Sequence, residues 1–431
     1  MKKEQVVQYI QLIKAETAPA MGCTEPAAAA LCAAAAAGQL GRPPETLTVE
    51  VSAYIFKNAM NVGIPGISEI GLNIACAMGA VCARPEKGLS VLADLDENQR
   101  KAAKILAQHT TISIASGTPK VYIRAVACAD GEYGEAVIQD THTQFVYFGK
   151  NGECTMRRCP DTPVPAEPNA DKEEPVSLDI AGIWEFGRQV GAEQLYFLRE
   201  LVEVNSAIAQ EGLTNTYGLQ VGKRMRCGAD IGLIAEDTAN FAVAVTAAAA
   251  DARMSGCEKA VMSVAGSGNQ GLTATLPVIA VAMKTGKSEE IMLRSLAISI
   301  LTTIHAKEYV GRLSVLCGCG VASAIGVTAG IVFMLGGSLP QAEMGIRTMT
   351  ADISGIVCDG AKPGCALKIA TSVSAAMRAA TFALSGIGAT DHDGIVAGDV
   401  EDTLKNLGDL GLEGMADTNR IILDMLLHKQ K

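Results

Sequence analysis

The sequence predicts an α+β protein in which a large helical domain carries an inserted α/β domain. Apart from one stretch, AVMSVAG, segments with alternating β-branched residues and turn signals lie within residues 46–160. Everything after residue 176 has the apolar spacing of helices, punctuated by Gly, Ser and Asn. The chain has 431 residues, of which 49% are hydrophobic and only 4% aromatic. We therefore expect more than one domain, with helices that pack closely through small side chains.

The N-terminal segment predicts two helices. Apolar residues recur at helical spacing over residues 4–18, and an alanine-rich run follows over residues 27–37. Thr24 is a suitable N-cap for the second helix, and Gly38 is a suitable end. We expect both helices to join the helical domain, so that residues 1–45 belong to it.

The inserted α/β domain is expected over residues 46–160, with helices near 69–84 and 95–108 between its strands. Residues 161–176 are rich in proline and charge, which is typical of an exposed linker. Residues 177–431 then form the helical domain, with one strand-like stretch, AVMSVAG. The strand-like sequences of the insertion are LTVEVSAYI, TISIASGTPKVYIRAVACAD, GEAVIQDTHTQFVYFG and ECTMRRC.

Composition excludes several classes of protein. Lys and Arg number 36 against 46 Asp and Glu, a net charge of −10, so the chain lacks the excess positive charge that binds nucleic acid. The N-terminus continues as a charged amphipathic stretch and not as an apolar signal segment, which favours the cytoplasm. The 13 cysteines are an odd number in a chain large enough to need no disulfides. We expect reduced thiols, some of which could bind metal.

One segment raises the possibility of a membrane span. Residues 313–342 contain no charged side chain, and that length could cross a bilayer. The segment is diluted by Gly, Ser and Thr, and it lacks a flanking cluster of Lys or Arg. A buried pair of helices is therefore favoured over a membrane protein.

Four cysteines lie in two glycine-rich loops. Cys317 and Cys319 occur in RLSVLCGCGVAS, and Cys358 and Cys365 occur in ISGIVCDGAKPGCALK. Glycine-rich backbone allows close approach and offers N–H donors to sulfur, so such loops favour a zinc or iron-sulfur site. The alternative is that these thiols are small buried hydrophobic residues. The Asp-Gly and Pro-Gly turns favour metal binding for Cys358 and Cys365, whereas spacing cannot choose between Cys317 and Cys319.

A G-x-G-x-x-G pattern in VAGSGNQGLTATLP opens a predicted helix. No second strand or acidic residue follows at the distance that a dinucleotide-binding unit requires. Free amides at a helix N-terminus still attract an anion such as a carboxylate, and polar side chains add hydrogen bonds. A tight turn needed only for packing is the alternative. The candidate ligand-binding residues are Ser267, Gly268, Asn269 and Gln270.

Two further motifs carry polar or reactive side chains. Cys23 in MGCTEP precedes a helix, where the helix dipole lowers a thiol pKa, although a buried inert thiol is equally compatible. KNAMNVGIPG places Lys57, Asn58 and Asn61 in an expected loop, as one wall of a site or as a solvated turn. The histidines form no HExxH motif, and an isolated histidine is more often structural than catalytic. They are His109, His142, His305, His392 and His428.

Taken together, MGCTEP, KNAMNVGIPG, GSGNQG, RLSVLC and GIVCDGAKPGCALK resemble, in this order, the L-cysteine desulfidase family. That family is related to the iron-sulfur L-serine dehydratase alpha chain. The resemblance implies a 4Fe-4S cluster held by Cys317, Cys358 and Cys365, with one iron open for substrate. The family pattern does not demand Cys319. Related serine dehydratases end in a cysteine that binds the cluster, whereas this chain ends in LLHKQK, so Cys23 is a candidate to protect the open iron.

The resemblance also implies a reaction, the β-elimination of L-cysteine to pyruvate, ammonia and hydrogen sulfide in a helical catalytic domain. The loop at residues 266–271 with Lys57 and Asn58 is assigned to the substrate carboxylate. Cys23 is the first candidate for the base that removes the α-proton, and Lys57 is the second.

Two alternatives stay open. A serine or other 2-amino-acid dehydratase would use the same cluster with another leaving group. A structural zinc protein would instead close a four-thiolate site and require Cys319. The expected ligand is otherwise a small amino acid, with no nucleic acid and no membrane, and the long apolar helices are compatible with a homodimer.

Overall fold

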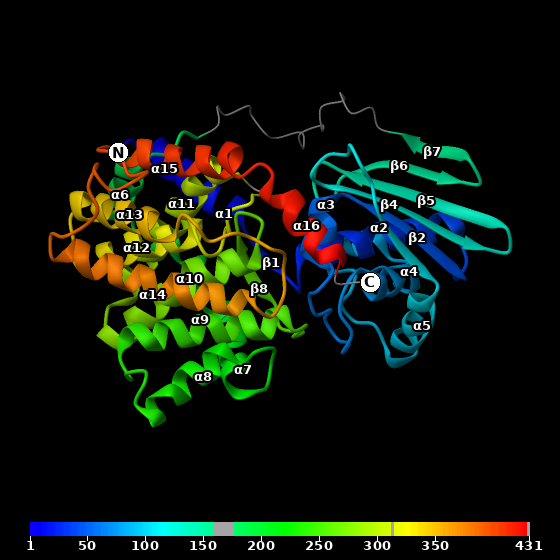
Figure 1. The fold of residues 1–431 in the computed structure, drawn as a ribbon, viewed down its shortest axis with the longest axis horizontal. Helices are drawn as coiled ribbons and strands as arrows, with labels where there is room; N and C mark the ends of the chain where they lie inside the picture. The colour runs from blue at the N-terminus through cyan, green and yellow to red at the C-terminus, as the bar shows by residue number, and fades with distance from the viewer. Residues whose placement is uncertain (158–175, 312–313, 429–431) are drawn as a thin grey trace.

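The computed structural model describes residues 1–157, 176–311 and 314–428. A helical lobe and an α/β lobe lie side by side (Figure 1), which confirms the α+β class. Most of the expected linker, residues 161–175, lies outside the described residues. Each lobe has its own hydrophobic core.

The α/β lobe is built on a six-stranded sheet in the order β3-β2-β4-β5-β6-β7. Only β2 and β3 are parallel, and the other neighbours are antiparallel. A parallel pair needs a crossover, which α3 (Ala53–Ala59), α4 (Leu72–Cys82), a 3-10 turn at Pro85–Ser90 and α5 (Glu97–Gln108) supply. The strands are β2 (Thr46–Val51), β3 (Thr110–Ile114), β4 (Tyr122–Ala129), β5 (Glu132–Gln139), β6 (Phe145–Lys150) and β7 (Glu153–Arg157).

The alanine-rich helix α2 (Thr24–Leu40) packs on this sheet and on α4, although we expected it in the helical domain. Its small side chains allow very close contact, since a Cβ on Gly79 of α4 would lie 2.0 Å from the carbonyl oxygen of Ala30. The helix continues past Gly38 and ends at Gly41, which has a left-handed φ of 79°. Residues 1–45 are therefore divided between the two cores.

The helical lobe contains the rest of the N-terminal segment. α1 (Lys3–Glu16) contributes Tyr9 and Ile13 to its core, and β1 (Thr17–Ala20) pairs antiparallel with β8 (Val261–Val264). The remaining α-helices are α6 (Ile180–Gln189), α7 (Leu198–Thr214), α8 (Val221–Cys227), α9 (Thr238–Met254), α10 (Gly268–Thr285), α11 (Glu289–Val310), α12 (Ala322–Met334), α13 (Leu339–Ile353), α14 (Cys365–Leu384), α15 (Val400–Asp409) and α16 (Thr418–His428). Short 3-10 turns at Ala192–Leu195 and Gly228–Ile231 and a π-helical turn at Leu410–Gly414 connect some of them.

The central helices of this lobe are buried almost all round, and small residues make this possible. A Cβ on Gly326 of α12 would lie 2.3 Å from the carbonyl oxygen of Ser299 on α11. The uncharged segment at 313–342 contributes α12 and the start of α13. Within the described parts of the chain, no helix has both the length and the apolar character needed to cross a bilayer.

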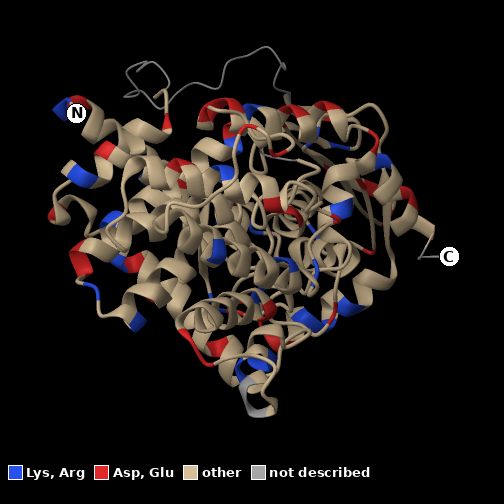
Figure 2. Cartoon of the chain, turned by 60° about the vertical axis from the view of Figure 1, so that its left-hand side comes forward, with Lys and Arg blue, Asp and Glu red and all other residues tan. Residues whose placement is uncertain are grey.

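Charged residues of both signs are interspersed over the two lobes (Figure 2). Many form exposed pairs, such as Arg42 with Asp130 and Arg199 with Glu289. Exposed pairs of this kind add little stability.

The C-terminal helix joins the lobes. After α15 in the helical lobe, α16 lies between the two lobes (Figure 1), and Leu423 and Leu427 pack against the core of the α/β lobe. Asn419 near the start of α16 donates to the hydroxyl of Tyr54 at 2.9 Å and accepts from Lys57 Nζ at 2.7 Å. The helix thereby contributes to the site described next.

Candidate functional site

A cavity of about 410 Å³ opens between the two lobes and collects most of the side chains singled out in the sequence. The helical lobe supplies Arg253, Ser267, Asn269, Gln270, Lys307, Cys317, Cys319, Cys358 and Cys365. The α/β lobe supplies Cys23, Glu25, Tyr54, Lys57, Asn58, Lys120, Asp140, Thr141 and His142.

The two cysteine loops meet through their backbones. Cys317 N donates to Ile356 O at 2.9 Å, and Cys358 N donates to Val315 O at 2.6 Å, as in a short antiparallel pair of strands. This pairing explains why thiols some forty residues apart line one cavity. Cys365 follows as the first residue of α14, and the sulfurs of Cys317 and Cys319 are 3.4 Å apart.

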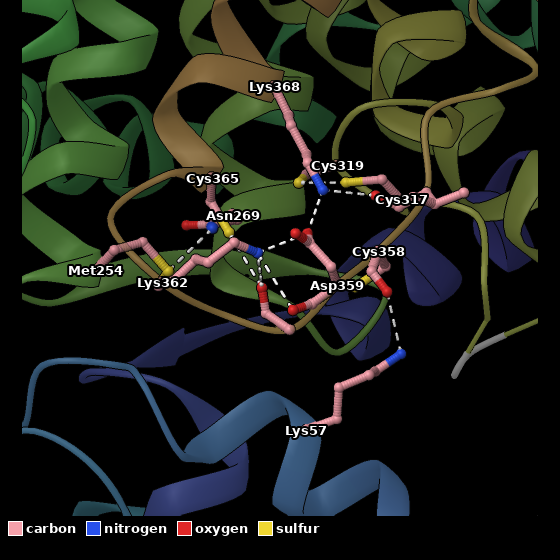
Figure 3. A network of polar contacts seen from close by, with 12 residues as sticks. Lys57, Met254, Asn269, Cys317, Cys319, Cys358, Asp359, Lys362, Cys365 and Lys368 are labelled. Carbon is pink, nitrogen blue, oxygen red and sulfur yellow. Dashed lines mark hydrogen bonds and ion pairs between the residues drawn. The ribbon is translucent and has the colours of Figure 1, made fainter. Parts of the chain in front are cut away.

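Lysines hold the second cysteine loop in place (Figure 3). Lys362 and Lys368 both pair with the carboxylate of Asp359, and Lys362 Nζ also donates to the carbonyl of Gly360 at 3.0 Å. Gly360 has a φ of 93°, and a Cβ there would lie 2.1 Å from the carbonyl oxygen of Lys57. The loop is therefore fixed directly against α3 of the other lobe.

The thiols differ in their readiness to ionise. A hydrogen bond from Cys319 lowers the pKa of the Cys317 thiol, and Lys368 and Lys307 add to this effect. The same hydrogen bond raises the pKa of Cys319. Burial raises the pKa of Cys365 to about 11 and also raises that of Cys358, against the influence of Lys57 on the latter. A bound metal would have to offset the free-energy cost of ionising these buried thiols. Coordination of a thiolate to a cation provides that stabilisation.

The cavity offers the ligand type that iron-sulfur clusters use. In the described chain, no three His, Cys, Asp or Glu side chains converge on the position of a single ion. The thiolates of a 4Fe-4S cluster each bind a different iron, so they surround a space and do not converge on one point. Four thiols line one cavity, with the ammonium groups of Lys57, Lys307, Lys362 and Lys368 close by, so the type of donor present suits such a cluster.

Arg253 is a functional candidate that sequence reasoning missed. It is only 3% exposed, lines the cavity, and makes no ion pair with any described side chain. Its guanidinium donates to two neutral acceptors, the carbonyl of Gly22 at 2.7 Å and Oδ1 of Asn269 at 3.0 Å. These bonds link the MGCTEP and GSGNQG motifs. A buried cation without a countercharge favours binding of an anion.

The GSGNQG motif opens α10, as predicted, and places Ser267, Asn269 and Gln270 on the cavity. Gln270 Nε2 donates to the carbonyls of Val264 and Ala265, which leaves its buried Oε1 without a partner. Gly268 does not line the cavity. It packs against Arg253, where a Cβ would lie 2.4 Å from Nε.

Cys23 precedes α2 as expected, but its thiol is not activated. Burial and the neighbouring carboxylate of Glu25 raise the pKa of Cys23, and the thiol donates to Glu25 Oε2 at 3.1 Å. The expectation that the helix dipole would lower this pKa is wrong, because burial and, after it, a carboxylate two residues away outweigh the dipole. Asn58 Nδ2 donates to the other oxygen of Glu25 at 2.9 Å.

Lys57 and Asn58 lie in α3, not in the expected loop, because Ser52 caps a short helix there. Lys57 is buried, which lowers the pKa of its ammonium, and Nζ donates to Cys358 O at 3.2 Å and to Asn419. Asn61 follows α3 and is not among the residues that line the cavity.

Unsatisfied polar atoms gather on the cavity. Of twelve buried side-chain atoms without a hydrogen-bond partner in the described chain, four belong to cavity-lining residues: Asn58 Oδ1, His142 Nε2, Arg253 Nε and Gln270 Oε1. Folded proteins leave few such atoms, since each costs about 1–3 kcal/mol. Their concentration indicates a place where a polar ligand binds.

The chain matches the family model described as serine dehydratase alpha chain over residues 86–424. It belongs to that family, which confirms the relation inferred from the five motifs. A UPF0597 protein of Oleidesulfovibrio alaskensis is 41% identical over 432 residues, covering all of both chains. A UPF0597 protein of Bacteroides fragilis is 39% identical to this chain over the full length of both. One of Clostridium perfringens is 38% identical to it over 98% of each chain.

Proposed function

We propose that this protein is an iron-sulfur lyase that eliminates hydrogen sulfide from L-cysteine, yielding pyruvate and ammonia. Membership of the serine dehydratase alpha chain family suggests a lyase of the dehydratase type. The observation that carries the proposal is the single cavity that joins four thiols to unsatisfied polar groups of both lobes. Cys317, Cys358 and Cys365 would hold a 4Fe-4S cluster.

The polar wall suits an α-amino acid. Arg253 and the amides at the start of α10 favour a carboxylate. The unpartnered oxygens of Gln270 and Asn58 accept hydrogen bonds, so they suit the α-ammonium group. Donors and acceptors on one cavity thus match the two ends of the same substrate.

The reaction breaks two bonds. The Cα–H bond gives its electron pair to the new Cα=Cβ double bond, and the Cβ–S bond breaks with its pair on sulfur. A bound cluster with an open iron would supply a Lewis acid for the substrate thiolate and the departing sulfide. Aminoacrylate then tautomerises and takes up water to give pyruvate and ammonia.

Cys23 and Lys57 are the two candidate catalytic residues that the motifs offer as proton acceptors. As proton acceptors both must first lose a proton, because Cys23 is held as a thiol by Glu25 and Lys57 donates two hydrogen bonds. The ammonium of Lys57 also offsets negative charge near the Cys358 sulfur. The α-proton therefore calls for a further acceptor.

The test is to purify the protein without oxygen and supply L-cysteine or L-serine, measuring sulfide, pyruvate and ammonia. Equal amounts of the three products from L-cysteine, with slower turnover of L-serine, are expected. Faster pyruvate formation from L-serine would support the dehydratase alternative, which the family description favours. No product from either substrate would contradict a lyase.

A further inference from the structure

The α/β lobe lines the same cavity as the thiols, and it contributes one histidine to the cavity wall. His142 lies in the connection between β5 and β6 and lines the cavity together with Asp140 and Thr141. Its Nε2 is buried and has no hydrogen-bond partner in the described chain.

The backbone holds the histidine in place. Asp140 N donates to Val121 O at 3.1 Å, and Gln139 N donates to Gln144 O at 3.0 Å, which fixes the turn at the end of the sheet. Asp140 has a left-handed φ of 68°, a conformation that L-residues adopt at a cost. A turn that buries an unpartnered nitrogen in a cavity is costly, and ligand binding is a reason to retain it.

We propose that His142 is a catalytic residue that accepts the α-proton of the amino-acid substrate. This proposal rests on the lyase function proposed above. The imidazole forms an N–H bond with the proton released from Cα, while the Cα–H electron pair enters the double bond and sulfide departs. The proton passes to solvent after product release, so that no oxidant or reductant is needed.

His142 suits this role better than the two earlier candidates. A neutral imidazole carries a free lone pair on one nitrogen, whereas Cys23 and Lys57 hold their protons in hydrogen bonds. In this role the inserted lobe supplies a reacting group to the cavity that the thiols of the helical lobe also line.

The test compares the wild type with His142→Gln, which places an amide nitrogen or oxygen near the former Nε2 but cannot accept the proton. Iron content and the visible spectrum should be unchanged, and kcat for L-cysteine should fall by about 10²–10⁴-fold. The isotope effect with α-deuterated L-cysteine should rise, and added imidazole should restore part of the rate. His109→Gln, which changes an exposed histidine outside the cavity, should behave as wild type.

A second variant separates catalysis from folding. His142→Leu removes the unsatisfied nitrogen, so it should melt at the same or a higher temperature while being as inactive as His142→Gln. Turnover of His142→Gln within threefold of wild type, or loss of its iron, would overturn the proposal. Wild-type protein that releases no sulfide would instead contradict the lyase function itself.

Discussion

Replacing Arg253 tests how the cavity recognises its substrate. The guanidinium is buried without a countercharge beside the start of α10, so we expect it to bind the substrate carboxylate. A hydrogen bond to a charged group contributes about 1.5–3 kcal/mol, which corresponds to about 10–150-fold in affinity. Arg253→Met should therefore raise KM for L-cysteine by about 10–150-fold.

Two thiol ligands make this prediction specific. Cysteamine lacks the carboxylate, so we expect it to inhibit wild type and Arg253→Met with similar constants. Arg199→Met, which removes an exposed arginine paired with Glu289, serves as the control. Equal weakening of L-cysteine and cysteamine in Arg253→Met would refute the reasoning, because it would mean general damage to the cavity. Thermal melting of each variant measures the separate cost of leaving Gly22 O and Asn269 Oδ1 without their donor.

Two further predictions concern stability. Gly326→Ala places a Cβ 2.3 Å from Ser299 O and should destabilise the protein by about 1–3 kcal/mol in thermal melts. Gly38→Ala, whose Cβ would meet open space on a helix, should stabilise the protein by about 1 kcal/mol. Equal effects of the two substitutions on stability would contradict the packing argument. Burial opposes the charge of His305, but hydrogen bonds to Glu308 and Glu401 raise its pKa to about 9. Because the folded pKa lies above the ordinary histidine value of about 6.5, this interaction stabilises by up to about 3 kcal/mol below pH 6.5 and is lost as pH rises through 9. His305→Gln should remove that pH dependence from denaturant melts, and an unchanged pH profile would exclude the interaction as its cause.

Local patterns predicted much of the architecture. Alternation of β-branched residues identified the strands of the α/β lobe, because strand periodicity is set within a few residues. The glycine-rich loops and the start of α10 were likewise visible, since both depend on short-range backbone chemistry. The placement of α2 was not, because an alanine-rich helix fits closely against either a sheet or other helices.

The chemistry of the site depended on contacts between distant segments. Glu25 controls the Cys23 thiol through a side-chain bond that the helix-dipole argument ignored. Arg253 lies in an alanine-rich stretch and reaches the cavity only because α9 ends beside Gly22 and Asn269. His142 lies within the strand-like sequence GEAVIQDTHTQFVYFG, but the structure has a connection between β5 and β6 there, and the cavity that His142 lines is formed by both lobes.

The central claim is that three of the four cavity cysteines hold a 4Fe-4S cluster that acts on L-cysteine. The most direct test is iron, sulfide and zinc analysis of protein purified without oxygen, for wild type, Cys358→Ala and Cys319→Ala. We expect brown wild-type protein with about four irons per chain, an equal content in Cys319→Ala, and loss of iron and sulfide release in Cys358→Ala. Colourless protein that binds about one zinc per chain and loses it in Cys319→Ala would contradict the claim and establish a structural four-thiolate site.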